Sequence, residues 1–285
     1  MIPAAFDYER AESVDHAIDL LGQHGEDAKL LAGGHSLLPL MRLRLARPSV
    51  LVDIDRLSDL EYVRDAGDHI AIGALTRMCD LALDPVLAQH NPLVAGAAGE
   101  VGDPQVRHRA TIGGCAAHGD PASDPTTVLL ALDADIVAKG PSGERVIPAA
   151  EFFTSFFETA LQPAEVLTEI RVPKLAAGTG WSYQKFHRRA IDWAIVGVAA
   201  TVERENGSIR SARVGLTNMG MTPLRAAAVE AALAGSPATA DAIAAAAENA
   251  PEGTSPPSDT NGTAEYRREM SKVFVRRALQ EALSR

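Results

Sequence analysis

Residues 28–42 read Ala-Lys-Leu-Leu-Ala-Gly-Gly-His-Ser-Leu-Leu-Pro-Leu-Met-Arg, and this stretch decides how the first part of the chain folds. The apolar run Leu30–Ala32 predicts a short buried strand, and the residues after Ser36 can form a helix. The two glycines between them allow positive φ angles and let a ligand come close to the main chain. A helix start also presents unpaired N–H groups, which suit a phosphate. The stretch therefore predicts either an anion-binding turn to which Ser36 adds a hydroxyl, or an ordinary strand–helix turn capped by Ser36.

A second glycine cluster, Thr111-Ile112-Gly113-Gly114-Cys115, follows about eighty residues later. A Rossmann dinucleotide site would need Gly-x-Gly-x-x-Gly at the start of a helix, with an acidic residue in register. Neither cluster has that pattern. The pair therefore indicates a different kind of ligand site.

The segments around the two clusters alternate between helices and strands. A helix is expected over residues 13–21 with Ser13 as its N-cap, and Glu205-Asn206-Gly207-Ser208 predicts a hairpin turn between two strands. After the small, flexible residues 176–180 the pattern changes to antiparallel strands followed by Ala-rich helices. Further strands are expected over residues 50–54, 69–75, 135–139, 145–147, 166–172, 183–186, 195–203 and 209–216, and further helices over 86–99, 127–132, 224–233, 241–250 and 264–284.

Composition excludes several classes of function. The 285 residues carry a net charge of −10, which disfavours nucleic acid as a partner. No apolar run reaches the roughly 20 residues that a membrane span needs, and the first residues lack the pattern of a signal peptide. The two cysteines, Cys79 and Cys115, are too few for a disulfide framework or an iron–sulfur site. A two-domain, cytoplasmic protein is expected, with peripheral association at the inner face of the membrane as a further expectation.

The two clusters, in this order and spacing, resemble those of the FAD-binding subunits of the molybdenum hydroxylases, the xanthine dehydrogenase superfamily. The resemblance spans nearly the whole chain and is closest to the carbon monoxide dehydrogenase branch of that family. The motifs that carry it are Met1–Pro3 with Phe6–Tyr8, Leu31–Leu37, Arg44–Ala46 with Pro48, Asp103–Arg107, Thr111–Gly114, Gly119–Pro121, Gly215–Asn218 and Ala264–Arg267.

The resemblance implies an α+β fold. Residues 1–177 would form a FAD-binding domain of the vanillyl-alcohol-oxidase (PCMH) type, with subdomains of about 1–56 and 57–177. Residues 178–285 would form a C-terminal flavoprotein domain in which a three-stranded antiparallel sheet packs on helices. FAD would lie extended in the crevice between the two subdomains, with a glycine cluster on each side of its pyrophosphate. N–H groups of both clusters could then neutralise the diphosphate without a lysine.

Eleven candidate FAD contacts lie in the two clusters. Ser36 and Thr111 are expected to donate hydroxyl hydrogen bonds to the pyrophosphate, with helix capping as the alternative for each. His35 is expected to contribute its backbone rather than its ring. Cys115 stands where the family commonly has Asp or Asn, and it is not expected to be redox-active. The eleven residues are Ala32, Gly33, Gly34, His35, Ser36, Leu37, Thr111, Ile112, Gly113, Gly114 and Cys115.

Five further candidates lie outside the clusters. Asp124, in the pair Ser123-Asp124, is expected on the sugar hydroxyls of the cofactor, with an Asx turn as the alternative. Leu161 is expected against the adenine or ribose, and core packing is the alternative. Lys185 matches a family lysine near the flavin, where a cation stabilises the reduced ring, although a solvated strand lysine is an equal alternative. Trp193 stands where the carbon monoxide dehydrogenases have a tyrosine that can cover the ring.

As the resemblance implies, the chain is the FAD-carrying electron-transfer subunit of a molybdenum hydroxylase. It would receive electrons from the [2Fe–2S] clusters of a small partner subunit, and a large partner subunit would hold the molybdenum cofactor. A dimer of such heterotrimers and an external electron acceptor are expected. The substrate is expected to be carbon monoxide, while N-heterocycles, aldehydes and aromatic thioesters stay open. No catalytic residue and no metal ligand is nominated in this chain.

Two other classes of function compete with this interpretation. Gly34-His35-Ser36-Leu37-Leu38 resembles the nucleophile elbow Gly-x-Ser-x-Gly of serine hydrolases, but Leu38 replaces the last glycine. The chain could also be a ligand-binding or regulatory module that keeps the flavin fold without electron transfer.

Overall fold

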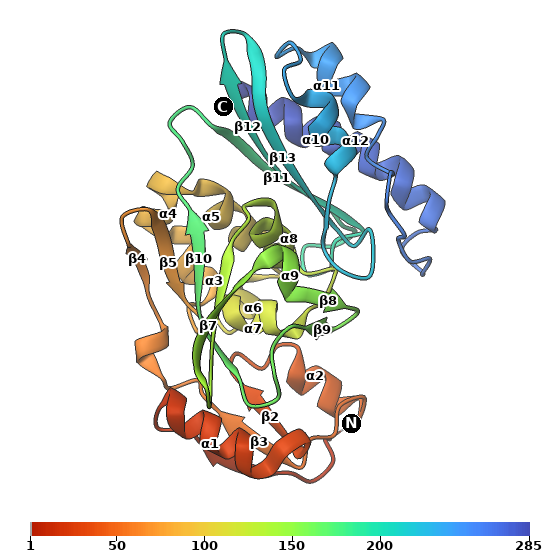
Figure 1. The fold of residues 1–285 in the computed structure, drawn as a ribbon. Helices are drawn as coiled ribbons and strands as arrows, with labels where there is room; N and C mark the ends of the chain where they lie inside the picture. The colour runs from red at the N-terminus through yellow and green to blue at the C-terminus, as the bar shows by residue number, and fades with distance from the viewer. Residues whose placement is uncertain (1) are drawn as a thin grey trace.

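The computed structural model describes residues 2–285, so Met1 of the Met1–Pro3 motif lies outside the described part of the chain. These residues form three tiers, which follow one another along the chain from the bottom to the top of Figure 1. The lower two tiers are α/β units, and the third is joined to them by residues 174–179, between β10 (Val166–Pro173) and β11 (Gly180–Phe186).

The first subdomain is a small parallel sheet with helices beside it. Its strands lie in the order β1-β3-β2, and both pairs are parallel, as strand–helix–strand crossovers require. The expected helix forms because the Ser13 hydroxyl accepts a hydrogen bond of 3.0 Å from the His16 N–H at its start. The elements are β1 (Asp7–Arg10), α1 (Val14–His24), the 3₁₀ turn η1 (Gly25–Asp27), β2 (Ala28–Leu31), α2 (Leu37–Arg42) and β3 (Val50–Asp53).

The second subdomain is an antiparallel sheet covered by short helices. The strands lie in the order β4-β5-β10-β6-β7, and a separate hairpin pairs β8 with β9. The further elements are η2 (Ser58–Leu60), β4 (Val63–Asp65), β5 (His69–Gly73), α3 (Met78–Leu83), α4 (Pro85–His90), α5 (Pro92–Gly99), α6 (Pro104–Arg107), α7 (Ile112–His118), α8 (Asp124–Ala131), β6 (Asp135–Gly140), β7 (Gly143–Pro148), α9 (Ala149–Phe152), β8 (Phe153–Ser155) and β9 (Glu158–Thr159).

Two helices of this subdomain differ from the expectation. The single helix over residues 86–99 is in fact two, because Pro92 begins α5 and has no N–H with which to continue α4. The second glycine cluster, where no helix was expected, is the start of α7, and Thr111 caps that helix by accepting a hydrogen bond of 3.2 Å from the Gly114 N–H.

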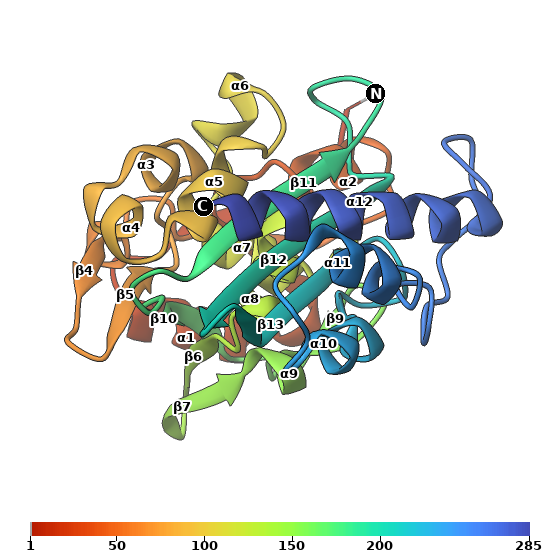
Figure 2. The same cartoon turned by 90° about the horizontal axis from the view of Figure 1, so that it is seen from above.

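The C-terminal domain contains the expected antiparallel strands β11, β12 (Val196–Glu205) and β13 (Ser208–Thr217), with the predicted turn at Asn206 (φ 51°) and Gly207 (φ 80°). A two-residue strand, β14 (Leu224–Arg225), extends the sheet because Leu224 pairs with Leu216. The helix expected over 224–233 therefore begins only at Ala227. The helices α10 (Ala227–Leu233), α11 (Ala240–Ala247) and α12 (Ala264–Ser284) cover one face of the sheet, as Figure 2 shows.

Close contacts join the three tiers. Ile18 and Val52 of the first subdomain form one apolar cluster with Leu75 and Val166 of the second, so the two subdomains share a core. The free face of the C-terminal sheet packs on α8, where a side-chain carbon at Gly215 would lie 2.8 Å from the Thr127 carbonyl oxygen. That contact leaves no room for a side chain between β13 and α8.

The packing of α12 predicts the effect of a core truncation. Leu279 is fully buried in the C-terminal core, so Leu279→Ala should lower the free energy of unfolding of that domain by about 2–5 kcal/mol. Leu83→Ala is a matched control, because Leu83 also lies in a helix but is 86% exposed, and it should change stability by less than about 0.5 kcal/mol. Chemical denaturation followed by circular dichroism measures both. Equal effects for the two variants would contradict the placement of α12.

Candidate functional site

A cavity of about 550 Å³ lies between the first two subdomains, a size within the range of cofactor sites. β2 and the first glycine turn form one wall, and the start of α7 with the β8–β9 hairpin forms the other. The structure brings eleven of the sixteen candidate residues to this cavity: Ala32, Gly33, Gly34, His35, Ser36, Leu37, Thr111, Gly113, Gly114, Cys115 and Leu161. Ile112 instead packs in the core, where it is 1% exposed.

The glycines let main chains touch at this boundary. A side-chain carbon on Gly33 would lie 1.9 Å from the Arg109 carbonyl oxygen, and one on Gly113 would lie 2.7 Å from the Ala74 carbonyl oxygen. At Gly114 the added carbon would meet the Thr111 hydroxyl at 2.7 Å and Ala32 of the opposite cluster at 4.0 Å. Thus Gly33 and Gly113 are required because main-chain atoms pack against them. Gly114 instead faces the gap between the two clusters.

The two clusters differ in their free hydrogen-bond donors. In the described part of the chain, no N–H group of residues 33–37 donates to a backbone or side-chain acceptor. In contrast, the Ile112 and Gly113 N–H groups donate to the carbonyl oxygens of Thr76 and Ala74, at 3.1 and 2.8 Å. The N–H groups of Gly114 and Cys115 donate to the Thr111 side chain and carbonyl oxygen. The expectation that both clusters offer free N–H groups is therefore wrong for the second one.

The two candidate hydroxyls also differ. Ser36 precedes α2 but makes no capping hydrogen bond, so its hydroxyl is free to meet a ligand. The Thr111 oxygen accepts the capping bond from Gly114, and its O–H can still donate.

Sequence reasoning missed other side chains that line the cavity. Lys29 is the one lysine or arginine in the lining formed by residues 2–285, so the cavity as a whole contains one cation. His118 faces the Phe157 ring, with ring centroids 4.9 Å apart. Burial lowers the pKa of His118, which keeps its ring neutral near pH 7. The sequence contains only a weak indication that Lys29 lines the cavity, namely its position directly before the apolar run that leads into the glycine turn.

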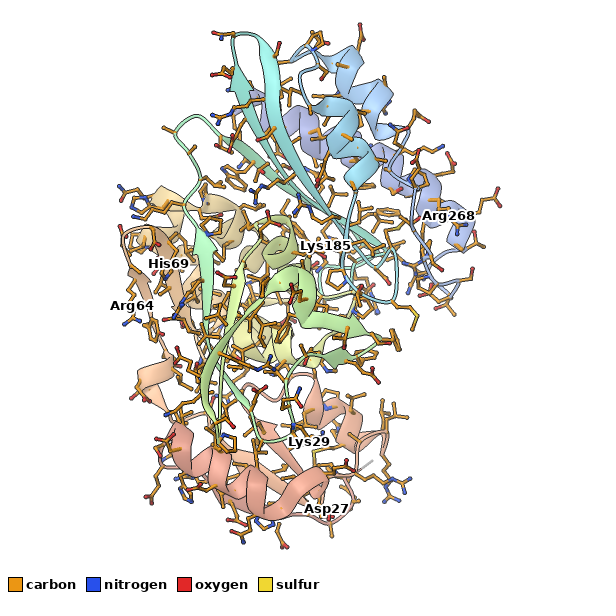
Figure 3. All side chains as sticks on the ribbon, in the orientation of Figure 1. Asp27, Lys29, Arg64, His69, Lys185 and Arg268 are labelled. Carbon is orange, nitrogen blue, oxygen red and sulfur yellow. The ribbon has the colours of Figure 1, made fainter. Side chains whose placement is uncertain are left out.

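Four other candidates lie outside this lining, toward the C-terminal domain. The carboxylate of Asp124, the first residue of α8, accepts hydrogen bonds from the Lys185 ammonium at 2.7 Å and the Tyr183 hydroxyl at 2.6 Å. Lys185 is 2% exposed and also donates to the Glu100 carbonyl oxygen, so it is not a solvated strand lysine. Figure 3 shows Lys185 between the middle and upper tiers and Lys29 in the lowest tier. Burial raises the pKa of the Asp124 carboxyl, although Lys185 and Tyr183 oppose that shift.

The remaining two candidates, Ser123 and Trp193, lie near Asp124 and the end of α7. Ser123 lies close to the Cys115 thiol. Trp193 is 59% exposed, and its side chain lies near the carboxylate of Asp120, close to the end of α7. Cys115 in α7 therefore lies between the cavity, which it lines, and Asp124, whose negative charge acts on its thiol.

The geometry gives no support to a hydrolase. Within residues 2–285 no imidazole or carboxylate is hydrogen-bonded to the Ser36 hydroxyl, and the His35 ring instead lies 3.3 Å from the Gly33 carbonyl oxygen. No three His, Cys, Asp or Glu side chains in the described chain are placed to hold a metal ion. No described helix is both long and apolar enough to cross a membrane.

Comparison with known proteins gives the class to which this fold and cavity belong. Residues 4–175 match the family described as the FAD binding domain in molybdopterin dehydrogenase. Residues 181–282 match the carbon monoxide dehydrogenase flavoprotein C-terminal domain. The chain therefore belongs to the family of FAD-binding subunits of molybdopterin dehydrogenases.

Several relatives are similar over their full length. The chain is 44% identical to the carbon monoxide dehydrogenase medium chain of Hydrogenophaga pseudoflava, covering 100% of this chain and 99% of that one. It is 42% identical to the 6-hydroxypseudooxynicotine dehydrogenase complex subunit alpha of Paenarthrobacter nicotinovorans, covering 100% and 97%. A solved structure of carbon monoxide dehydrogenase from Hydrogenophaga pseudoflava superimposes with a TM-score of 0.97 at 46% identity, covering 100% and 99% of the chains.

The environment of Cys115 predicts an inert thiol. Burial, with a contribution from the negative charge of Asp124, raises its pKa to about 12. Little of this thiol would then be ionised at pH 8, so alkylation by iodoacetamide should be at least about 100-fold slower than for free cysteine. Peptide mass spectrometry of the full chain measures the rate, and the unfolded chain in urea is the control. A folded Cys115 that reacts as fast as the unfolded one would contradict this environment.

Proposed function

We propose that this chain holds FAD along the cavity and carries electrons between partner subunits and an external acceptor. The observation that supports this most is the run of five N–H groups, residues 33–37, that line the cavity without protein acceptors. Successive N–H groups in a turn form a concave anion site. In the proposal, residues 1–177, with subdomains of about 1–56 and 57–177, bind the cofactor, and residues 178–285 form the C-terminal domain.

The residues of the cavity fit a dinucleotide. The N–H groups of residues 33–37, the hydroxyls of Ser36 and Thr111, and the Lys29 ammonium would bind the pyrophosphate. Gly114 keeps the space between the two clusters open, because its nearest neighbour across the cleft is Ala32. Leu161 would contact the adenosine portion. FAD, when bound, supplies the redox chemistry, and the protein supplies position and electrostatics.

The flavin ring would extend toward the region of Asp124, Lys185 and Trp193. Lys185 is buried and paired with Asp124, so the pair would present a fixed dipole rather than a mobile charge. The side chain of Trp193 is 59% exposed, and its indole face can cover an aromatic ring. The Asp124 carboxylate already accepts bonds from Lys185 and Tyr183, so it would bind the cofactor with its remaining lone pairs.

The partners in this proposal are a small subunit with [2Fe–2S] clusters and a large subunit with the molybdenum cofactor, assembled as a dimer of heterotrimers. The names of the relatives, which are medium chains or subunits of dehydrogenases, support a multi-subunit assembly. A cytoplasmic location, supported by the free thiols of Cys79 and Cys115, belongs to the same proposal.

Carbon monoxide is the substrate that we propose for the assembly, because the relative at 44% identity is a carbon monoxide dehydrogenase medium chain. An N-heterocycle or aldehyde dehydrogenase is the second candidate, because a relative at 42% identity belongs to a 6-hydroxypseudooxynicotine dehydrogenase complex. The substrate would be selected at molybdenum, on another chain.

The free hydroxyl of Ser36 predicts a loss of cofactor affinity on truncation. A hydrogen bond to a charged group contributes about 1.5–3 kcal/mol, so Ser36→Ala should raise the dissociation constant for FAD by about tenfold or more. Ser13→Ala is the matched control, because that hydroxyl caps α1 away from the cavity; it should reduce stability without changing FAD affinity. Titration of the FAD-depleted complex measures both constants. An unchanged constant for Ser36→Ala would exclude this hydroxyl from the cofactor site.

The electron-transfer role predicts a spectral response. The purified complex should show flavin absorbance, and anaerobic carbon monoxide should bleach it, because electrons from the substrate would reach the flavin through the partner subunits. A preparation without the molybdenum subunit is the control and should not respond. No flavin in the loaded complex would refute the proposal. Bleaching by an N-heterocycle or aldehyde, but not by carbon monoxide, would favour the second candidate.

A further inference from the structure

An ionic cluster joins the first two subdomains directly behind the cavity. Asp55 follows β3, at the point where the Ile54 N–H donates to the Leu31 carbonyl oxygen at 3.0 Å. Its carboxylate therefore lies at the carboxyl ends of β2 and β3, close to where the first glycine turn begins. Asp55 is 23% exposed and does not line the cavity.

Two arginines of the second subdomain bind this one carboxylate. Arg77 lies 3.2 Å from one carboxylate oxygen, and Arg109 lies 3.1 Å from the other. Their side chains are 20% and 43% exposed, so the cluster is partly shielded from solvent. Glu61 also lies 3.4 Å from Arg77 but belongs to the second subdomain, so Asp55 is the acid that bridges the two.

Both arginines are connected to the second glycine cluster. The backbone of Arg77 pairs with Thr111, and its guanidinium donates to the His108 carbonyl oxygen at 2.7 Å. The carbonyl oxygen of Arg109 is the atom that faces Gly33 so closely that no side-chain carbon fits between them. The carboxylate thus binds the segment that leads into one cluster and holds it against the turn of the other.

We infer that Asp55 is a positioning residue for the cofactor site: with Arg77 and Arg109 it forms a latch that sets the separation of the two glycine clusters. This inference rests on the proposed location of FAD between those clusters. The latch acts on binding indirectly, because none of its three side chains lines the cavity. The ligand class that it serves is a dinucleotide diphosphate.

If charge alone controlled the affinity for FAD, removing the Asp55 carboxylate would have the opposite effect. Removing the charge of Asp55 leaves Arg77 and Arg109 uncompensated near an anionic ligand, which by charge alone would tighten binding. Removing an arginine would by charge alone weaken it. A latch requires that both kinds of variant weaken binding, because each of them breaks the same bridge.

The test is the dissociation constant of FAD for the full chain in its complex, after reversible removal of FAD. Asp55→Asn, Arg77→Met and Arg109→Met should each raise it by about tenfold. Asp55→Glu keeps the charge and should stay within about threefold of the wild type. Amide hydrogen exchange over residues 103–111 should become faster in FAD-free Asp55→Asn, while exchange in the C-terminal sheet stays unchanged.

Asp133→Asn is the matched control, because Asp133 also pairs with two arginines, Arg213 and Arg225, but at the boundary between α8 and the C-terminal sheet. It should leave FAD affinity unchanged. Unchanged or tighter binding by Asp55→Asn, or an equal loss in Asp133→Asn, would overturn the latch. If Asp55→Asn does not fold, the two arginine variants decide the question. Absence of FAD binding by the wild type would refute the proposed function instead.

Discussion

The main-chain contact between Gly33 and the Arg109 carbonyl is the constraint on which the cofactor cavity depends. A side-chain carbon would lie 1.9 Å from that oxygen, so residue 33 must be glycine for the two subdomains to meet in this way. The contact brings the first glycine turn against the segment that leads into the second cluster, and the cavity lies beside this contact. Because main-chain atoms cannot change rotamer, the separation of the clusters is set more rigidly here than side-chain packing alone would allow.

The charge of the chain favours N–H groups over carboxylate-paired cations for the anion site that we propose. The chain has a net charge of −10, and Glu158 and Glu165 line the cavity. A diphosphate would therefore approach an acidic protein. Lys29 alone would provide one cation in the described lining. The five unpaired N–H groups of residues 33–37 add fixed dipoles that carry no net charge and need no counterion. Because the N–H groups of Ile112–Cys115 have acceptors within the protein, the two walls differ: free N–H donors lie on one wall, and the other wall offers the Thr111 hydroxyl.

The parts of the fold that sequence predicted are those with local signals. Ser13 marks the start of α1, and Asn206-Gly207 specifies the two-residue β12–β13 hairpin because both residues take the positive φ angles that this turn requires. The elements that the sequence did not predict depend on contacts with other segments of the chain. β14 forms through pairing with β13, and α7 forms despite two glycines because Thr111 caps it and Ala74 accepts a bond from its first turn.

The same distinction holds for the candidate site. The two glycine clusters are contiguous motifs, so their residues can be identified from the sequence alone. Lys29 has only a weak local signal, and the bridge from Asp55 to Arg77 and Arg109 has none, because its members are 22 and 54 residues apart. The burial of Lys185 likewise depends on its pairing with Asp124, 61 residues away. Contacts at such separations leave no periodicity in the sequence.

The buried Asp124–Lys185 pair connects the cofactor domain to the C-terminal domain in a way that hydrophobic packing does not. An ion pair removed from water gains little net stability, because desolvation offsets the attraction, but breaking it is costly. Lys185 and Tyr183 come from β11, whereas Asp124 begins α8 only nine residues after Cys115 of the cavity wall. The pair thus specifies one arrangement of the two domains rather than adding to stability. Because the Asp124 carboxylate accepts bonds from both Tyr183 and Lys185, a shift of β11 relative to α8 would break both bonds at once.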